Sequence, residues 1–302
     1  MAYSVSSLTE YVDQQRLPLL VAATFGAKTA SLVSKMTGVK SSAALNIMNT
    51  DAVFQTQACS WNASGTTTFT QRNLTVGKIA VMEELCPKTL EAYWMQSQIM
   101  AGTPDAVPFE EEFTMKKAAV IASQLETAIW QGDTTSGNDN LNKFDGYIKL
   151  INAAGTAISA TAQADITTST VRGIMQDIYT KIPAAILDKD DLVVFCGWDV
   201  FRMYQIALAT ANLYHYNGEA GNGEMFIENS GVRLIAVNGL NGTDRIFAGR
   251  KSNFFVGVDL EGEEDTFEIF FAREARTVRY VCEFKYGVQV AFPDQIVSYQ
   301  NS

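Results

Sequence analysis

The sequence contains little of the chemistry on which enzymes depend. Its 302 residues include one histidine, His215, in the segment NLYHYNGEAGNGE. A Ser-His-Asp or Cys-His mechanism would have to use this residue, and no GxSxG nucleophile motif accompanies it. A loop histidine packed among tyrosines is the simpler interpretation. We therefore expect no catalytic site, no cofactor and no enzymatic activity.

Cysteine and long apolar runs are also scarce. The four cysteines are far apart and form no CxxC pair, which argues against a zinc framework or a disulfide scaffold and fits a reducing cytoplasm. The apolar segment 17–27 follows Glu10 and Asp13, where a secretory signal would carry basic residues. No other stretch approaches about 18 apolar residues, so we expect no membrane partner.

Basic residues are too few for tight binding to a phosphate backbone. The 23 Lys and Arg are outnumbered by 33 Asp and Glu, which gives a formal charge of -10. Sequence-specific nucleic-acid binding is therefore not expected. Charged residues make up 19% of the chain, below the roughly 25% of an average protein. This low fraction indicates that part of the surface is buried against other subunits.

The pattern of the first third of the sequence predicts an extended arm followed by a β-hairpin. Residues 1–52 are rich in Ser, Ala and Thr, with a weak helical pattern at 8–20. Residues 53–82 contain two β-rich runs separated by NASG, which is hairpin chemistry. Leu74 and Val76 share one face, whereas Ile79 and Val81 continue the alternation one residue out of phase. Such a phase slip is typical of a β-bulge.

A long amphipathic helix is predicted over residues 109–131. Three glutamates occupy its first turn, where the helix dipole favours them, and at 23 residues it would span about 35 Å. Its apolar face is expected to contain Phe109, Phe113, Val120, Ile121, Leu125 and Ile129.

The helix is followed by the loop WQGDTTSGNDNLNKFDGYIKLI, whose first two glycines have the GxxxxG spacing of a phosphate-binding loop. Asn138 and Asp139 stand where that motif needs Lys and Ser or Thr, and a helix precedes it instead of a strand. Counting from Asp133, an EF-hand fails because its sixth and twelfth positions are Asn138 and Phe144. We interpret the loop as a structural joint in which Gly132 ends the helix, while Gly137 and Gly146 supply positive φ.

The rest of the chain predicts an inserted α/β domain and a closing strand. Residues 147–151 are expected as a short strand, 169–182 and 198–214 as helices, and 192–195 as a buried strand. VRLIAV, RIFAG, NFFVGV and TFEIFF predict further strands, which we group in a domain over residues 191–271. Every second residue from Val278 to Phe292 is apolar, so this segment predicts a long strand and a partner for segment 74–85.

This order of elements resembles the major capsid protein of tailed bacteriophages, the Hong Kong 97-like fold. CSWNASGTTTFTQRNLTVGKIAVMEELCPKTLEAYW is similar to its extended E-loop, WQGDTTSGNDNLNKFDGYIKLI to the end of its spine helix, and FKYGVQVAFPDQIVSY to its closing P-domain strands. The resemblance implies an α+β fold with an arm (1–52), an E-loop hairpin (53–82), a P-domain (83–190 and 272–302) and an A-domain (191–271).

The resemblance also implies a function and the surfaces that serve it. Subunits would assemble into hexamers and pentamers of an icosahedral virion shell around double-stranded DNA, in the host cytoplasm, with portal, scaffold and decoration proteins as further partners. The E-loop would contact a neighbouring subunit through Cys59, Trp61, Asn62, Ser64, Gly65, Thr66 and Phe69. The centre of the capsomer would be lined by Tyr214, His215, Tyr216, Gly218 and Gly221.

Two alternatives remain open at this point. An encapsulin-like compartment shares the fold but encloses cargo enzyme instead of DNA. A soluble α/β enzyme would place its substrate at the turn from Cys196 to Asp199, where a strand ends and a helix begins.

Overall fold

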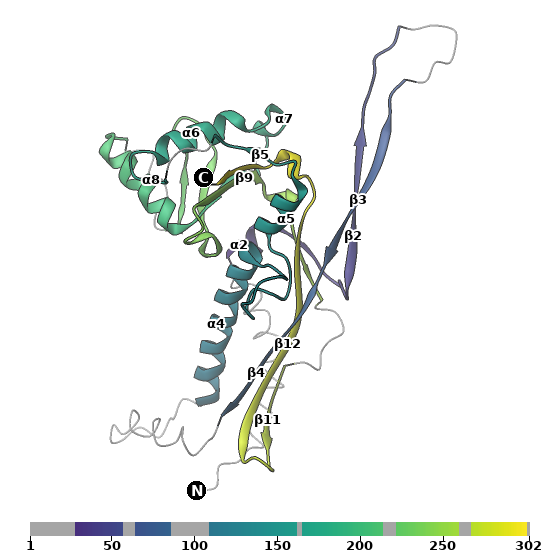
Figure 1. Ribbon diagram of the computed structural model, residues 1–302, viewed down its shortest axis with the longest axis vertical. Coiled ribbons are helices and arrows are strands. Elements are labelled where there is room, and N and C mark those ends of the chain that lie inside the picture. Colours follow the sequence, from purple (N-terminus) through teal and green to yellow (C-terminus); the bar gives the residue numbers. More distant parts are fainter. Residues whose placement is uncertain are drawn as a thin grey trace.

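The computed structural model describes residues 28–56, 64–85, 109–161, 165–213, 222–259 and 267–300. These residues form a six-stranded sheet, a five-stranded sheet and a two-stranded ribbon. The two larger sheets and their helices make up the body of the subunit, and the ribbon projects away from it (Figure 1). The mixed helix and strand content agrees with the predicted class. The helix expected at 8–20 lies outside the described residues.

One long strand, β12 (Thr277–Val290), organises the five-stranded sheet. It pairs antiparallel with β4 (Gly77–Leu85), β10 (Phe254–Val258) and β11 (Phe267–Ala272). A short edge strand, β1 (Ser34–Met36), runs parallel to β10. The predicted pairing of segment 74–85 with the closing strand is confirmed, since residues 77–85 are in register with β12.

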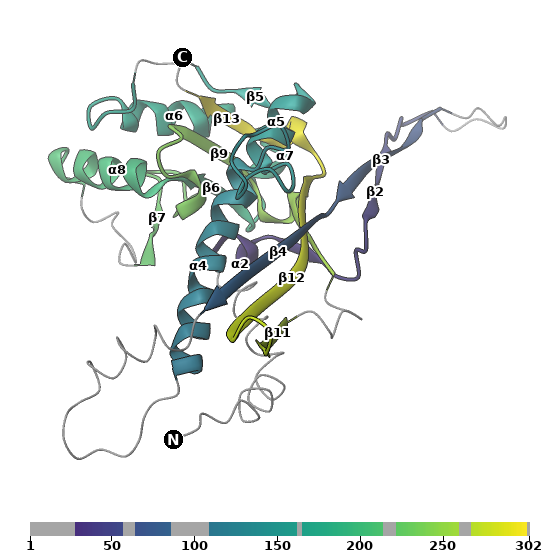
Figure 2. The same cartoon turned by 60° about the horizontal axis from the view of Figure 1, so that its bottom comes forward.

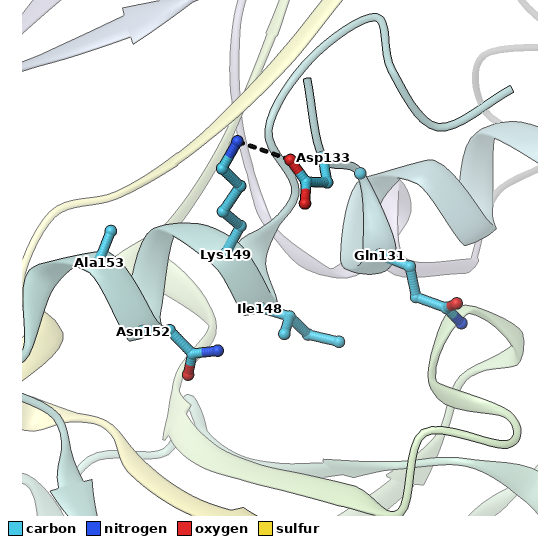
Figure 3. A pocket seen from close by; sticks show the side chains of 7 residues that line it. Gln131, Asp133, Ile148, Lys149, Asn152 and Ala153 are labelled. Carbon is cyan, nitrogen blue, oxygen red and sulfur yellow. Dashed lines mark hydrogen bonds and ion pairs between the residues drawn. The ribbon is translucent and has the colours of Figure 1, made fainter. Parts of the chain in front are cut away.

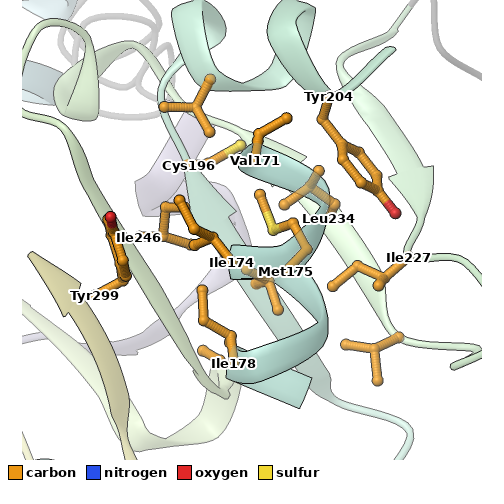
Figure 4. Close-up of a cluster of buried hydrophobic side chains, with 14 of the residues drawn as sticks. Val171, Ile174, Met175, Ile178, Cys196, Tyr204, Ile227, Leu234, Ile246 and Tyr299 are labelled. Atoms are coloured by element: carbon orange, nitrogen blue, oxygen red, sulfur yellow. The ribbon is translucent and has the colours of Figure 1, made fainter. Parts of the chain in front are cut away.

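The six-stranded sheet is the second large sheet of the body. Its order is β5 (Ile158–Ser159), β13 (Val297–Gln300), β9 (Arg245–Arg250), β6 (Leu192–Cys196), β8 (Arg233–Ala236) and β7 (Glu224–Phe226). One face is covered by α6 (Val171–Lys181) and α8 (Trp198–Thr210). Figure 4 shows Ile174, Met175 and Ile178 of α6 lying against this face. The described residues also contain short helices: α2 (Lys28–Leu32), α7 (Ala184–Leu187), η3 (Asn238–Leu240), η4 (Lys251–Asn253) and η5 (Pro293–Gln295).

The opposite face of this sheet packs on the predicted long helix, α4 (Phe109–Gln131). The bounds of α4 match the prediction. At its buried end, Trp130 stacks on Phe247 at a ring distance of 5.7 Å and meets Tyr147 edge-on at 5.3 Å. This aromatic cluster joins α4, α5 (Tyr147–Ala154) and both large sheets in one core. Because both faces of the six-stranded sheet are covered, every residue of β6 is buried.

Three predictions about the body are wrong. Residues 147–151 belong to a helix, α5 (Tyr147–Ala154), whose buried Tyr147 and Ile151 are one helical turn apart. Val120 of α4 is 54% exposed and not on its core face. Strands β10 and β11 belong to the β12 sheet, not to the inserted domain, while β13 joins the six-stranded sheet. Alternation marks a strand but does not choose its partner.

The ribbon consists of β2 (Ser42–Thr50) and β3 (Thr67–Thr75). The predicted hairpin is confirmed in its return strand, but its outgoing strand lies at 42–50, in the segment assigned to the arm, and not after Val53. The phase slip between Val76 and Ile79 is real, because Leu74 and Val76 are buried while Lys78 and Ala80 are exposed. It marks the point where the chain leaves the ribbon and joins β12, rather than a bulge within one ladder. No helix within the described ranges is long and apolar enough to cross a membrane.

Candidate assembly surfaces

The ribbon carries an exposed apolar pair, which we call the apolar rung. Met48 of β2 and Phe69 of β3 are directly opposite in the register and are 59% and 74% exposed. On one side of the rung, Gln71 donates a hydrogen bond to Asn46 at 2.8 Å, and on the other the hydroxyls of Thr50 and Thr67 are 3.0 Å apart. The polar side chains on either side of the rung therefore form hydrogen bonds within the ribbon, whereas Met48 and Phe69 are exposed to solvent.

An isolated two-stranded ribbon of this kind is only marginally stable by itself. Its outer edges present unpaired backbone groups, since no third described strand pairs with β2 or β3. Figure 2, a view turned by 60°, shows the same separation between the ribbon and the body. A surface with open edges and an exposed aromatic side chain is suited to contact with another protein.

The described part of the ribbon tip includes three predicted contact residues. Thr66 accepts a backbone hydrogen bond from Asp51 at 3.0 Å, Ser64 contacts Gln55, and Gly65 has φ +116. All three are exposed. Phe54 beside them is fully exposed, at 100%. Cys59, Trp61 and Asn62 lie outside the described residues.

Sequence reasoning missed Met48 and Phe54 as candidates for this surface. Their signal is weak, because SAALNIMNT mixes small, polar and apolar residues and does not read as a strand with one buried face. Only the register with β3 brings Met48 opposite Phe69.

In the joint, residues 132–146, two glycines are in close contact, but neither Gly137 nor Gly146 has the predicted positive φ. Gly132 and Gly146 touch, with Gly146 N donating to Gly132 O at 2.8 Å. A Cβ on Gly146 would lie 2.6 Å from both Gly132 N and Trp130 O. Gly146 has φ -80, whereas Gly137 is absent from the positive-φ residues, and a Cβ added to Gly137 would meet no atom within 4 Å. Gly132 and Gly146 are therefore required because neither position has space for a side chain. Gly137 is required neither for space nor for a positive φ.

Two aspartates of the joint, Asp133 and Asp145, form ion pairs with Lys149. Lys149 Nζ lies 2.7 Å from Asp133 Oδ1 and 2.6 Å from Asp145 Oδ1. Hydrogen bonds from Lys149 and Thr135 lower the pKa of Asp133 to about 2. The ammonium group occupies the position that a cation would need, and no group of three metal-ligating side chains occurs in the described part of the chain.

Beside the joint lies an open depression of about 470 Å³. Figure 3 shows Lys149 pointing from α5 towards Asp133, with Gln131, Ile148 and Asn152 around the same space. Gln131 Nε2 is already committed to the carbonyl of Gly239 at 2.7 Å. Since its one cation is neutralised by two carboxylates, the depression offers no charge for a phosphate or a carboxylate ligand.

At the turn from Cys196 to Asp199, where an enzyme would bind substrate, the carboxylate of Asp199 is occupied by internal hydrogen bonds. Asp199 accepts hydrogen bonds from Val200 N at 2.9 Å and Gly242 N at 3.0 Å. Cys196 is buried, and burial raises the pKa of its thiol far above the ordinary value. A buried neutral thiol is not a nucleophile. These contacts hold the turn in place and do not assemble a catalytic set.

The predicted capsomer-centre residues, Tyr214, His215, Tyr216, Gly218 and Gly221, lie outside the described residues. In the sequence they follow α8 and precede β7, which is the edge strand of the six-stranded sheet. On β7, Phe226 is partly exposed and carries the Arg233 guanidinium 5.6 Å above its ring. Among the described strands, only β8 pairs with β7, so the other edge of β7 has no strand partner in that part of the chain.

No family model matches the sequence, and no curated protein matches it significantly. Solved structures, in contrast, match nearly the whole chain. A chain of a satellite phage P4 procapsid that includes the size determination protein Sid is 11% identical, with a TM-score of 0.64, and the match covers 95% of this chain and 90% of that one. The capsid of Myoviridae phage XM1 is 10% identical, with a TM-score of 0.59 and 90% of each chain covered.

A third match is the capsid of an empty GTA particle, at 13% identity, a TM-score of 0.57, and coverage of 93% of this chain and 90% of that one. At such low identity the similarity is one of backbone arrangement. The chain therefore has the fold found in these capsid structures, and the resemblance predicted from the sequence is confirmed at the level of the fold.

Proposed function

We propose that this chain is the major shell subunit of a tailed bacteriophage head, and that it assembles into the hexamers and pentamers of an icosahedral capsid. The observation that carries this proposal is the apolar rung on a ribbon that has no partner within the described subunit. Burying a phenylalanine side chain contributes about 1.5–3 kcal/mol. Repeated at every subunit contact, such a contribution adds to the free energy that favours a closed assembly.

The charge of the chain suits an enclosed double-stranded DNA that is not held at specific sequences. A shell of acidic subunits, each with a formal charge of -10, retains DNA by enclosure and leaves it free to move. Portal, scaffold and decoration proteins are the further partners that such a head requires. The mature location is the virion, after assembly in the host cytoplasm.

The remaining predicted surfaces take their roles from this assembly. The ribbon tip, from Ser64 to Phe69, would reach over a neighbouring subunit. The segment around His215, which precedes β7 in the sequence, would face its copies at the capsomer centre. The joint would hold the C-terminal end of α4 against the sheets when neighbouring subunits bind the ribbon.

The proposal is tested with the purified full-length chain and one shortened variant. In the variant, residues 46–71 are replaced by Asn-Gly, because a two-residue turn can join Leu45 to its cross-strand neighbour Arg72. Light scattering and negative-stain microscopy should show rings, shells or tubes for the parent. The variant should remain a folded monomer by circular dichroism and form none of these. A parent that stays monomeric at high concentration, with or without scaffold, would contradict the proposal.

A further inference from the structure

Glycines gather where the ribbon enters the body. Gly257 of β10 and Gly287 of β12 are directly opposite each other in the register, so they open the same face of the sheet. The other face at this level carries Val256, Val288 and Tyr286, which belong to the main core. The glycine face is covered instead by the last residues of β3, at the root of the ribbon.

The fit at this root is close. A Cβ on Gly257 would overlap the Cδ2 atom of Leu74, with Cδ1 and Cγ at 3.3 Å. A Cβ on Gly287 would overlap the carbonyl of Thr75 and lie 2.9 Å from Val76 Cα. Leu74 is fully buried and packs with Val39, Val76 and Phe255. Leu74 therefore fills the space left by the missing side chain of Gly257, and the backbone of Thr75 and Val76 fills the space left at Gly287.

A third glycine bounds the root from the other direction. A Cβ added to Gly77, the first residue of β4, would lie 2.8 Å from Lys143 C and would overlap the carbonyl oxygen of Lys143. The joint therefore touches the chain at the point where it leaves the ribbon. On the opposite side, Gln289 Nε2 donates to the carbonyl of Asn73 at 2.6 Å. The root is therefore held on several sides over residues 73–77.

We propose that Gly257, Gly287 and Gly77 form a notch that fixes the direction in which the ribbon projects, and through it the size of the closed particle. The second half of this inference rests on the proposed shell function. The ribbon extends from the notch as a lever of about 3.3 Å per residue. A change in the angle of the ribbon at Leu74 therefore produces a displacement that grows towards the rung and tip, where a neighbour would be met.

The direction of the ribbon can be measured on the unassembled subunit. Spin labels are placed on Thr68→Cys in β3 and Ala153→Cys in α5, both exposed positions, with Cys59 and Cys86 changed to Ser. The distance between the labels is compared for the parent, for Gly257→Ala, and for Gly257→Ala combined with Leu74→Val, which removes the overlapping Cδ atoms. Gly173→Ala, at a glycine with no atom within 4 Å of the added carbon, is the matched control.

We expect Gly257→Ala to shift the mean distance, Leu74→Val to restore it, and Gly173→Ala to leave it unchanged. An unchanged distance in Gly257→Ala would overturn the notch. If Gly257→Ala does not fold, Leu74→Ala tests the same contact from the other side, because an empty notch should broaden the distance distribution; an unbroadened distribution would count against the proposal.

The link to particle size is read separately by microscopy of assembled material. Gly257→Ala particles should differ in diameter from parental ones, and the double variant should regain the parental diameter. A shifted label distance with unchanged diameters would overturn the link to size. If the parent forms no particles at all, the shell proposal fails while the label distances still decide whether the notch directs the ribbon.

Discussion

Glu126 holds Thr29 by two hydrogen bonds. Its Oε2 accepts from Thr29 N at 3.0 Å, and its Oε1 accepts from Thr29 Oγ1 at 2.5 Å. Trp130 Nε1 donates to the same hydroxyl at 2.8 Å. Thr29 lies on the short helix α2 (Lys28–Leu32), so the carboxylate fastens the N-terminal segment to α4. All three side chains are buried.

Because Glu126 is buried, its pKa is raised above the ordinary 4.5, against the opposing effects of the Thr29 hydrogen bonds and of nearby Lys28. A raised pKa means that the folded state binds this proton more tightly than the unfolded state. The stability that Glu126 contributes is therefore fully present below about pH 4.5 and declines as the pH rises through its folded pKa.

Glu126→Gln should remove this pH dependence. Urea unfolding of the unassembled subunit at pH 5 and pH 7.5 should show that the parent loses more stability than Glu126→Gln over this interval. Glu126→Ala is the comparison, because it leaves Thr29 without its acceptor and should cost about 1–3 kcal/mol at both pH values. Parallel pH profiles for the parent and the glutamine variant would rule out the assignment.

Phe69→Ser should weaken assembly without weakening the subunit. Phe69 is mostly exposed in the subunit, so its removal costs little there, whereas a contact that buries it loses roughly 1.5–3 kcal/mol. The critical concentration for assembly, measured by light scattering, should rise at least about tenfold. Thr68→Ala, on the opposite face of the same strand, is the control. Equal critical concentrations for the two variants would show that the rung is not an interface.

The glycines of the joint should differ sharply in their tolerance to alanine. Gly146→Ala places a carbon against the backbone of Gly132 and Trp130, which cannot rotate away, and should destabilise the subunit by about 1–3 kcal/mol. Gly137→Ala meets nothing within 4 Å and should change the unfolding free energy by less than about 0.5 kcal/mol. Urea unfolding of both variants is the measurement. Similar losses for both would mean that the joint does not depend on close packing.

Much of the fold could be predicted from the sequence because several elements carry their pattern locally. The helix 109–131 has its charge distribution and its apolar spacing within one segment, and the alternation from Val278 to Phe292 defines a strand without reference to any partner. The pairing of this strand with β4 followed because both are long and apolar on one face.

What could not be predicted depends on partners distant in the sequence. YIKLI fits a strand by composition, but Tyr147 and Ile151 form a helix because the aromatic cluster around Trp130 buries both. β10 alternates like a strand of the inserted domain, yet it pairs with β12. The exposed rung needs the register of two strands that residues 51–66 separate in the sequence, and the notch needs a third segment packed across two strands.

Assembly should strengthen as salt is added, up to a few hundred millimolar. Each subunit carries a formal charge of -10, so neighbouring copies repel one another at long range. The Debye length is about 10 Å at 0.1 M and 3 Å at 1 M, so salt screens this repulsion while the burial of apolar side chains is retained. The critical concentration measured at 20, 100 and 300 mM NaCl should therefore fall in that order. A rise over the same series would mean that attractive ion pairs, not apolar contacts such as the one proposed for Met48 and Phe69, dominate the interface.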